Sequence, residues 1–460
     1  MFFKRRSYLE KSDKILYLPI ETYSREFHSK LYLAYQACQK GWTVVIGPEY
    51  DIYKLARYSP SGVYFGIGFH LKSKKTSKIL KETGHLIILQ DEEGLDRWTP
   101  NIYKEHRVDP EIYNFVEYFL CWGNEDKKIL DTAFKNPINA IAVGNLRLDL
   151  LNHKLKKIFS ESVDDIKNNY GDFVLINGKF GTVNHTNGLD YYLNDLKMRG
   201  WINTPVKEEF HMQRIDFHKK IFEKMIELSI ELAKSGQKVV VRPHPSESII
   251  EWQKKINNYS ENIKIIRYGN IIPWLMAAKL IIHNGCTTAI EGLLLDKTIV
   301  SYRPHKNSKI ETDLPNTISI CLESKDEVVN YVKNFAANKT NINKKNSLDI
   351  LEKHIEINKS DQDASKRILE VIKNFSNKKK TSLIKLIKDN ILIELNLLKS
   401  MIYNMIFKKN FLYINSKCPQ IDLKETNKIL SLFQTNQNSN FKMKTLKLSK
   451  YSIVVSRKFD

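Results

Sequence analysis

The chain has 460 residues, of which 42% are hydrophobic and 27% are charged. At roughly 150 residues per domain, this length predicts about two to three domains, and the apolar fraction is sufficient for a sizeable core. The 73 lysines and arginines outnumber the 52 aspartates and glutamates, which gives a formal net charge of +21. This excess favours an anionic partner: nucleic acid, an anionic membrane surface, or a phosphorylated or carboxylated substrate.

Several classes of protein are disfavoured. The basic residues are dispersed and no nucleic-acid-binding motif is present, so we expect no nucleic-acid partner. No apolar stretch follows the basic N-terminus, and no uncharged apolar run reaches the roughly 18 residues of a membrane span. The odd number of cysteines, without CxxC spacing, disfavours a disulfide framework and a zinc site, and favours the cytoplasm. No metal-binding motif is present in the sequence, so we expect no metal. The cysteines are Cys38, Cys121, Cys286, Cys321 and Cys418.

The first 150 residues alternate short apolar runs with amphipathic stretches. Continuous apolar runs separated by helices are typical of buried parallel strands. Helices are predicted over 25–40 and 73–82. Strands are predicted at 15–19, 43–46, 63–66, 86–89, 119–122 and 140–143.

The same alternation resumes in the second half of the chain. A polar, aromatic insertion is expected at 184–210, followed by a helix over 216–235 that ends at Gly236. Strands are predicted at 173–177, 238–242, 263–267, 280–283 and 297–302. Repeated βα units imply an open parallel sheet in each half of the chain.

We therefore predict an α/β protein of two Rossmann-like domains, residues 1–150 and 151–376. By analogy, two such domains facing a cleft form the GT-B arrangement. Residues 377–460 are predicted to be a basic, amphipathic helical extension that is partly disordered beyond Lys424. Its lysines at 378–380 and the apolar spacing over 383–407 favour either docking on an anionic membrane surface or packing of a helix on the core.

The turn after the strand at 238–242 is the sharpest local feature. The strand ends in Arg242 and continues into a turn that carries two prolines, His244, Ser246 and Glu247. Proline fixes φ and removes a backbone donor, so this turn is stiff. Ligands bind at the carboxyl ends of strands in open α/β sheets, and a cation with an imidazole suits a phosphate. A structural turn with a capping histidine is the alternative.

A second candidate turn follows the strand at 280–283. Glycine permits a tight turn, and the free N–H groups of the helix that follows favour an anion. Thr288 and Glu291 also fit a capping box, so Glu291 either caps this helix or binds ribose hydroxyls. The candidate residues are Asn284, Gly285, Thr287, Thr288 and Glu291.

Three consecutive carboxylates, Asp91, Glu92 and Glu93, follow the predicted strand at 86–89. Crowded acids repel each other, which raises the pKa of at least one of them. Such a group can act as a general base or nucleophile in glycosyl chemistry. A solvated acidic turn is the alternative.

Lesser candidates follow the first predicted strand of each half. Ordinary helix caps and turns are the alternative for all of them. They are Glu21, Arg25, Asn177, Lys179, Gly181 and Thr182.

Taken together, these motifs resemble the bacterial surface carbohydrate biosynthesis protein family over roughly residues 13–335. Leu146 stands where that family usually has proline. The motifs are Leu18–Thr22 with Arg25 and Glu26, Asp91–Gly94, Gly144–Asp149, Phe180–Asn184, Arg242–Glu247 and His283–Thr288.

The chain is also similar, more distantly, to retaining capsule and O-antigen transferases that use CMP-activated ulosonic acids such as Kdo. This resemblance implies that Arg242 and His244 hold the CMP phosphate, and that one of Asp91–Glu93 attacks the anomeric carbon. It implies a metal-independent glycosyltransferase without a cofactor, which takes a nucleotide-sugar donor and a glycan or lipid-linked acceptor at the inner membrane face. A CDP-glycerol-type glycerophosphotransferase and a UDP-HexNAc epimerase are the alternatives.

Overall fold

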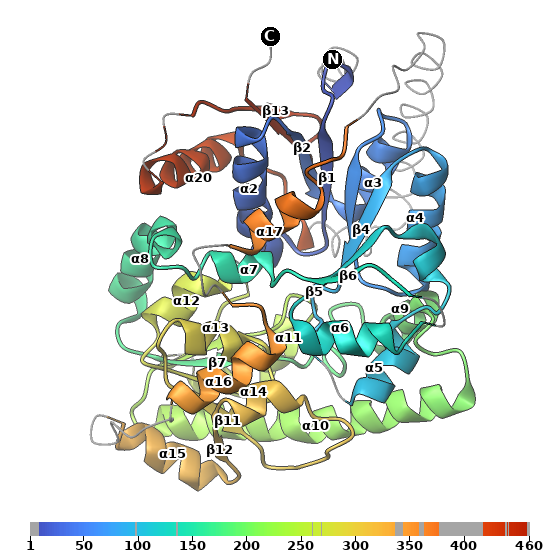
Figure 1. Ribbon diagram of the computed structural model, residues 1–460. Helices are drawn as coiled ribbons and strands as arrows, with labels where there is room; N and C mark the ends of the chain where they lie inside the picture. Colours follow the sequence, from blue (N-terminus) through green and yellow to red (C-terminus); the bar gives the residue numbers. More distant parts are fainter. Residues whose placement is uncertain are drawn as a thin grey trace. The chain divides into compact units, whose positions relative to one another are not determined.

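The computed structural model describes residues 9–96, 99–134, 137–259, 261–267, 269–335, 344–357, 363–376, 417–437, 439 and 441–457. The chain forms two compact units, whose elements are labelled in Figure 1. Unit 1 takes its residues from 1–92, 107–158 and 355–460, and unit 2 from 93–106 and 159–354. The predicted α/β class with two Rossmann-like domains is confirmed, because each unit has its own mainly parallel sheet with helices. The expected domains were continuous segments, whereas both units are discontinuous in sequence.

Unit 1 contains an eight-stranded sheet in which six parallel strands are extended by an antiparallel hairpin at one edge. In sheet order the strands are β13 (Lys444–Lys447), β14 (Ile453–Ser456), β2 (Thr43–Pro48), β1 (Ile15–Ile20), β3 (Val63–Ile67), β4 (Leu86–Gln90), β5 (Tyr118–Cys121) and β6 (Ala140–Ala142). The helices are α2 (Tyr23–Gln39), α3 (Glu49–Arg57), α4 (Leu71–Glu82), η1 (Ile112–Phe115), α6 (Asn124–Asp131), α7 (Leu146–Asp149), α17 (Ala364–Val371) and α20 (Leu423–Asn436). At the boundaries of the units lie α5 (Pro100–Arg107) and η2 (Leu155–Phe159).

Unit 2 contains a six-stranded sheet in which every neighbouring pair is parallel. In sheet order the strands are β12 (Ile320–Leu322), β11 (Ile299–Tyr302), β10 (Leu280–His283), β7 (Val174–Asn177), β8 (Val239–Arg242) and β9 (Ile263–Ile265). The helices are α8 (Ser160–Tyr170), α9 (Leu189–Arg199), α10 (Pro205–Lys234), α11 (Ile249–Ile256), η3 (Asn257–Tyr259), α12 (Ile271–Ala277), α13 (Thr288–Leu294), α14 (Asp313–Thr317), α15 (Lys325–Lys333) and α16 (Lys344–His354).

The order of these strands places a switch point at the centre of the unit 2 sheet. Counted from β7, the order is 3-2-1-4-5-6, as in doubly wound dinucleotide-binding domains. The chain builds outward in one direction from β7 to β9 and then returns to add β10 on the other side of β7. The crevice outside the carboxyl ends of β7 and β10 is therefore the position where this fold class binds ligands.

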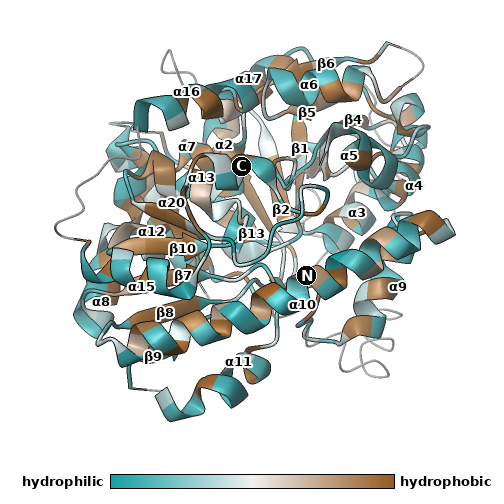
Figure 2. Cartoon of the chain, turned by 90° about the horizontal axis from the view of Figure 1, so that it is seen from below, coloured by the Kyte–Doolittle hydropathy of each residue, from teal (hydrophilic) through white to brown (hydrophobic). Residues whose placement is uncertain are grey.

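Helix α10 packs along the unit 2 core. Its buried residues Ile221, Met225, Leu228 and Leu232 recur at spacings of three and four, which form one apolar stripe. Bands of hydrophobic and hydrophilic residues alternate along the helix in Figure 2. The helix begins eleven residues before the predicted start at 216, because the Thr204 side chain accepts the Lys207 N–H and proline occupies its first turn.

The described residues beyond Lys424, where a partly disordered tail was expected, form most of α20 and the strands β13 and β14 of unit 1. β14 pairs with β2, with Val454 opposite Val45, and all its residues are buried. The Phe433 ring of α20 lies 5.1 Å from the Tyr32 ring of α2, centroid to centroid. The segments at 378–380 and 383–407, expected to be a basic amphipathic helix, lie outside the described residues. No helix in the described part of the chain is long and apolar enough to span a membrane.

We expect Phe433→Ala to lower the free energy of unfolding by about 3–5 kcal/mol, because the ring is fully buried against α2 and truncation leaves a cavity. Urea unfolding followed by circular dichroism measures this change. The exposed Lys424→Ala on the same helix is the control and should shift stability by about 0.5 kcal/mol or less. Equal stability of both variants would contradict the packing of α20 on unit 1.

Candidate functional site

Two loops at the carboxyl edge of the unit 2 sheet are held together by one buried carboxylate. Glu247 is fully buried and accepts hydrogen bonds from Phe180 N (2.9 Å) and His244 N (2.8 Å), one from each loop. A third bond comes from Trp252 Nε1 at 2.9 Å. Burial raises the pKa of the Glu247 carboxyl, and the N–H donors offset this only in part. Glu247 was predicted as a ligand-binding residue, and its buried carboxylate accepts hydrogen bonds from both loops and so links them.

Glycine allows the loop after β7 to approach this carboxylate. A Cβ atom at Gly178 would lie 2.6 Å from Glu247 Oε1, which real side chains do not tolerate. A Cβ atom at Gly181 would overlap the Ser246 hydroxyl. Both positions therefore require the absence of a side chain, and the loop at 178–182 packs directly on the turn at 243–247.

The turn fixes the tautomer of His244. The Ser246 backbone N–H donates to His244 Nδ1 at 3.2 Å, and the Ser246 hydroxyl lies 2.7 Å from the same atom. Because a backbone N–H can only donate, Nδ1 is the acceptor and the ring proton lies on Nε2 in the neutral imidazole. The side chain is partly exposed, so His244 presents an N–H donor at the strand ends.

Lys179 connects the two loops that flank the switch point. Its Nζ donates to Gly285 O at 3.0 Å, in the turn after β10, and to Asp96 Oδ1 and Thr312 Oγ1 at 2.5 Å each. Thr312 Oγ1 also donates to Asp96 Oδ1 at 2.8 Å. About a fifth of the Lys179 and Asp96 side chains is exposed, so this ion pair remains accessible to solvent.

Asn177 forms a second connection at the same point. Its Nδ2 donates to Thr288 Oγ1 at 2.8 Å, which links the end of β7 to the start of α13. Its buried Oδ1 has no hydrogen-bond partner in the described part of the chain. An unsatisfied buried acceptor costs about 1–3 kcal/mol, so a donor supplied by a ligand would stabilise this position.

The turn after β10 is fixed by a side-chain hydrogen bond and by a glycine. Asn284 Nδ2 donates to Tyr302 O at 2.7 Å, and Gly285 adopts a positive φ of 59°. Helix α13 begins at Thr288, so Thr287 is its N-cap, and the Thr287 side chain accepts no capping bond. The capping box suggested for Thr288 and Glu291 is therefore not formed, and Glu291 is buried in the first turn of the helix.

Arg242 points toward the body of unit 2. Its guanidinium lies 5.0 Å from the centre of the Trp274 ring and donates to Gly269 O at 2.8 Å. The residue is buried, with 6% of its surface exposed. The structure thus places Lys179 and the pair His244 and Ser246 on the loops after β7 and β8, while the Arg242 guanidinium stacks on the Trp274 ring.

Several polar residues near this edge were not singled out from the sequence. Among them are His218, whose Nδ1 lies 2.7 Å from Oγ1 of the predicted candidate Thr182, and Arg214, which donates to Tyr192 Oη at 3.0 Å. Burial, and then the charge of Arg214, hold the pKa of His218 well below its usual value, so the ring is neutral. The sequence pattern that could have revealed these residues lies in α10, where His211, Arg214 and His218 recur at helical spacing and therefore share one face. Nothing in the sequence ties Asp96 or Thr312 to Lys179.

The three acids of the turn after β4 have different surroundings, and Asp91 and Glu92 belong to unit 1 whereas Glu93 belongs to unit 2. Asp91 Oδ1 lies 3.3 Å from the Arg107 guanidinium, and Glu92 Oε1 lies 3.2 Å from Lys30 Nζ. Asp91 and Glu92 are buried, whereas Glu93 is partly exposed. The expected repulsion among three crowded acids is thus replaced by pairing of two of them with cations.

Lys30 is the centre of a buried charge cluster in unit 1. With 1% of its surface exposed, it contacts Glu26 Oε2 at 2.9 Å and Glu92 Oε1 at 3.2 Å, and donates to Pro19 O at 2.6 Å. Burial alone would lower the pKa of Lys30, but the two carboxylates outweigh it and raise the pKa.

The candidates Glu21 and Arg25 flank this cluster. The Arg25 guanidinium contacts Glu21 Oε2 at 3.2 Å and Glu26 Oε1 at 3.0 Å. No group of three or more histidine, cysteine, aspartate or glutamate side chains is placed to hold a metal ion in the residues that the structure describes.

No protein-family profile and no curated protein sequence matches the chain. Among solved structures, the UDP-GlcNAc 2-epimerase of Methanocaldococcus jannaschii, in complex with UDP-GlcNAc and UDP, is 15% identical, with a TM-score of 0.48 over 78% of this chain and 99% of that chain. A putative UDP-N-acetylglucosamine 2-epimerase from Listeria monocytogenes is 13% identical, with a TM-score of 0.47 over 81% and 98% of the two chains.

Replacing Lys30 by methionine should destabilise unit 1 by about 3–5 kcal/mol at pH 7, because Glu26 and Glu92 would be left as buried negative charges. Burial raises the pKa of Glu26, and Lys30 helps to hold it below its usual value in the wild type, so this pKa rises in the variant. The deficit should therefore shrink as the pH falls toward 4.5, because protonation of Glu26 removes one of the buried charges. Urea denaturation of the variant and the wild type at pH 7 and pH 4.5 measures both effects. The exposed Lys128→Ala, in the same unit, is the control and should leave stability within about 0.5 kcal/mol. A deficit that does not depend on pH would be inconsistent with buried charge.

Proposed function

We propose that this chain is an enzyme of nucleotide-sugar chemistry that binds the phosphate of its donor at the switch point of unit 2. The observation that carries this proposal is the position of Lys179, whose ammonium group bridges the loops after β7 and β10. This is the crevice where open α/β sheets of this strand order bind their ligands. A cation there is the counterpart that a phosphate requires, and a phosphate oxygen would replace one of the three oxygens to which Lys179 Nζ now donates.

His244 supplies the second phosphate contact. The hydrogen-bonded turn directs its N–H-bearing Nε2 away from Ser246, and the neighbouring loop carries Lys179. An ammonium group and an imidazole N–H stabilise the negative charge that builds up on a departing phosphate. Thr288 and the buried Asn177 Oδ1, which lie at the same strand ends, are the further polar contacts for the donor.

The reaction that we favour is glycosyl transfer in the synthesis of a surface polysaccharide. The donor is a CMP-linked sugar of the Kdo or nonulosonic type, and the acceptor is a glycan or a lipid-linked glycan at the cytoplasmic face of the inner membrane. In a retaining reaction a carboxylate bonds to the anomeric carbon as the bond to the CMP phosphate oxygen breaks. The acceptor hydroxyl then displaces that carboxylate from the anomeric carbon and gives up its proton to water. Glu93 is our candidate, because it is partly exposed whereas Asp91 and Glu92 are buried.

Epimerisation of a UDP-linked sugar is the second candidate, since that activity is named for the solved structures above. The two reactions differ in their products. A transferase releases CMP and extends an acceptor, whereas an epimerase converts UDP-GlcNAc without an acceptor. A glycerophosphotransferase would instead release CMP from CDP-glycerol. Mass spectrometry and proton NMR of the protein incubated with each donor, with and without acceptor glycan, distinguish the three.

We expect Lys179→Ala to weaken nucleotide binding at least tenfold, because a charge-assisted hydrogen bond to phosphate is worth about 1.5–3 kcal/mol. Isothermal titration with CMP, CDP and UDP measures this loss and identifies the nucleotide. The melting temperature should also fall, because the variant removes the ion pair with Asp96 and the bond to Gly285 O, so affinity is compared at a temperature at which both proteins are folded. Lys220→Ala on the solvent face of α10 is the control and should bind as the wild type does. Normal affinity in the Lys179 variant would place the phosphate elsewhere.

The acidic turn gives a separate prediction. Glu93→Gln should abolish turnover while the protein keeps its nucleotide affinity and its stability, because the carboxylate is partly exposed and is the reacting group. Glu92→Gln should lower the unfolding free energy by about 1–3 kcal/mol, since it removes a buried charge partner of Lys30. Turnover and chemical denaturation measured on both variants separate the two roles. Full activity of Glu93→Gln would eliminate this residue as the nucleophile.

A further inference from the structure

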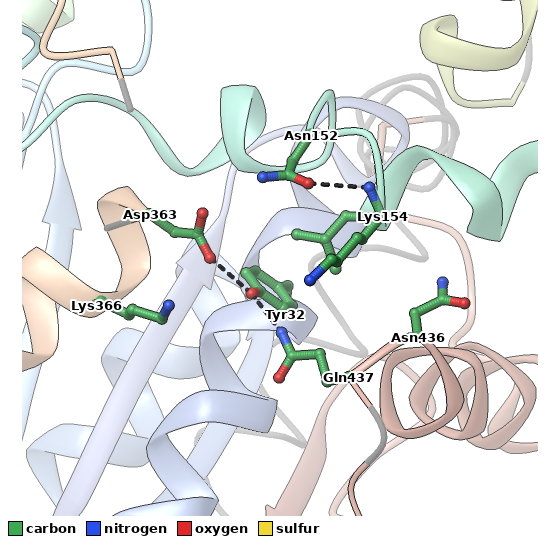
Figure 3. Close-up of a pocket in the computed structure, with 8 residues that line it drawn as sticks. Tyr32, Asn152, Lys154, Asp363, Lys366, Asn436 and Gln437 are labelled. Atoms are coloured by element: carbon green, nitrogen blue, oxygen red, sulfur yellow. Dashed lines mark hydrogen bonds between the residues drawn. The ribbon is translucent and has the colours of Figure 1, made fainter. Parts of the chain in front are cut away.

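Unit 1 contains a second polar pocket that the proposed reaction does not use. It has a volume of about 350 Å³ and is formed by α2, the loop after α7, the start of α17 and the end of α20 (Figure 3). It lies along the segments through which the chain leaves unit 1 near residue 158 and re-enters it near residue 355. Its lining residues are Tyr32, Asn152, Lys154, Leu155, Asp363, Lys366, Asn436 and Gln437.

The wall of the pocket is a rigid hydrogen-bonded unit. The Tyr32 hydroxyl donates to Asp363 Oδ2 at 2.9 Å and accepts from Gln437 Nε2 at 2.7 Å (Figure 3). Burial, and then the Asp363 carboxylate, raise the pKa of Tyr32 far above neutral pH, so the phenol remains a donor. Tyr32 and Asp363 are both buried. These contacts fix the wall before any ligand binds, which reduces the entropic cost of binding.

The rest of the lining is basic and rich in amides. Lys154 and Lys366 provide two ammonium groups against the single carboxylate of Asp363, and that carboxylate already accepts from Tyr32. Asn152, Asn436 and Gln437 contribute carboxamide groups. Lysine pairs favour phosphate, and carboxamides can donate to and accept from sugar hydroxyls. Leu155 is the one aliphatic side chain among the eight lining residues.

We infer that this pocket binds a phosphate monoester of a sugar. The volume is near the lower end of the range for small-molecule sites, about 300–1,000 Å³, and suits a hexose phosphate. The two lysines bind the phosphate, and the three carboxamides bind the hydroxyl groups. The preference for a sugar over a nucleoside follows from the wall, where the single aromatic ring, Tyr32, is buried and fixed by its hydrogen bonds.

Isothermal titration of the full-length chain with glucose 6-phosphate, CMP and inorganic phosphate tests this inference. We expect glucose 6-phosphate to bind more tightly than either of the others at this pocket. The double variant Lys154→Ala/Lys366→Ala should lose at least tenfold in affinity. The double variant Lys179→Ala/His244→Ala, which removes the phosphate contacts of unit 2, should keep it.

Two further variants separate a site from general charge effects. Lys72→Ala/Lys128→Ala removes two exposed lysines of the same unit, whose side chains are 56% and 71% exposed, and should bind glucose 6-phosphate normally. Asn436→Asp keeps the shape of the side chain but adds a negative charge, so it should weaken binding. The inference fails if the wild type does not bind glucose 6-phosphate. It also fails if Lys72→Ala/Lys128→Ala loses as much affinity for glucose 6-phosphate as Lys154→Ala/Lys366→Ala does. It fails as well if Lys179→Ala/His244→Ala is the one double variant that loses this affinity.

Discussion

The candidate phosphate site depends on the burial of one carboxylate, that of Glu247. A carboxylate without exposed surface is tolerated only when its oxygens accept hydrogen bonds. Here the donors are the backbone N–H groups of Phe180 and His244 and the indole of Trp252. The need to satisfy this group fixes the loops after β7 and β8 against each other. The orientation of His244 and the start of the loop that carries Lys179 follow from it.

In unit 1 the buried charge is positive, and the buried lysine requires negatively charged partners. Lys30 is enclosed by Glu26 and Glu92, which come from a helix and from the end of a neighbouring strand. Attraction in a weakly polar environment offsets the cost of removing these charges from water only when the geometry is good. The strand ends of unit 1 are therefore held in place by charge, whereas the loops of unit 2 are held mainly by neutral N–H donors.

Much of the fold could be predicted from the sequence, because buried parallel strands are continuous apolar runs. The strand predicted at 238–242 is observed as Val239–Arg242, and the one at 280–283 has the predicted bounds. The hairpin of β13 and β14 was not predicted. Lys444–Lys447 has a lysine at each end, and the short apolar run of Ile453–Ser456 pairs with β2, which lies about 400 residues away in the chain. Pairing over that distance is decided by tertiary packing and not by local propensity.

The sequence predicted which strand ends carry the site residues, but it did not predict the contacts that their side chains make. Pattern and spacing place Arg242 and His244 after one strand, yet the contact with Trp274 determines where the guanidinium points. Lys179 was a lesser candidate. Its partners Asp96 and Thr312 lie 83 and 133 residues away in sequence, so only the folded chain brings them together.

The placement of β14 also bears on how the protein is made. Unit 2 is encoded within residues 93–354, so all of it has left the ribosome while the last strand of unit 1 is still untranslated. At about 5–20 residues per second, the remaining hundred or so residues take about 5–20 s to synthesise. During that interval the outer edge of β2 has no partner strand, and exposed strand edges pair readily with other chains. The nascent protein is therefore prone to edge-to-edge association during this interval, and a chaperone bound at the β2 edge would protect it until β14 is synthesised and pairs.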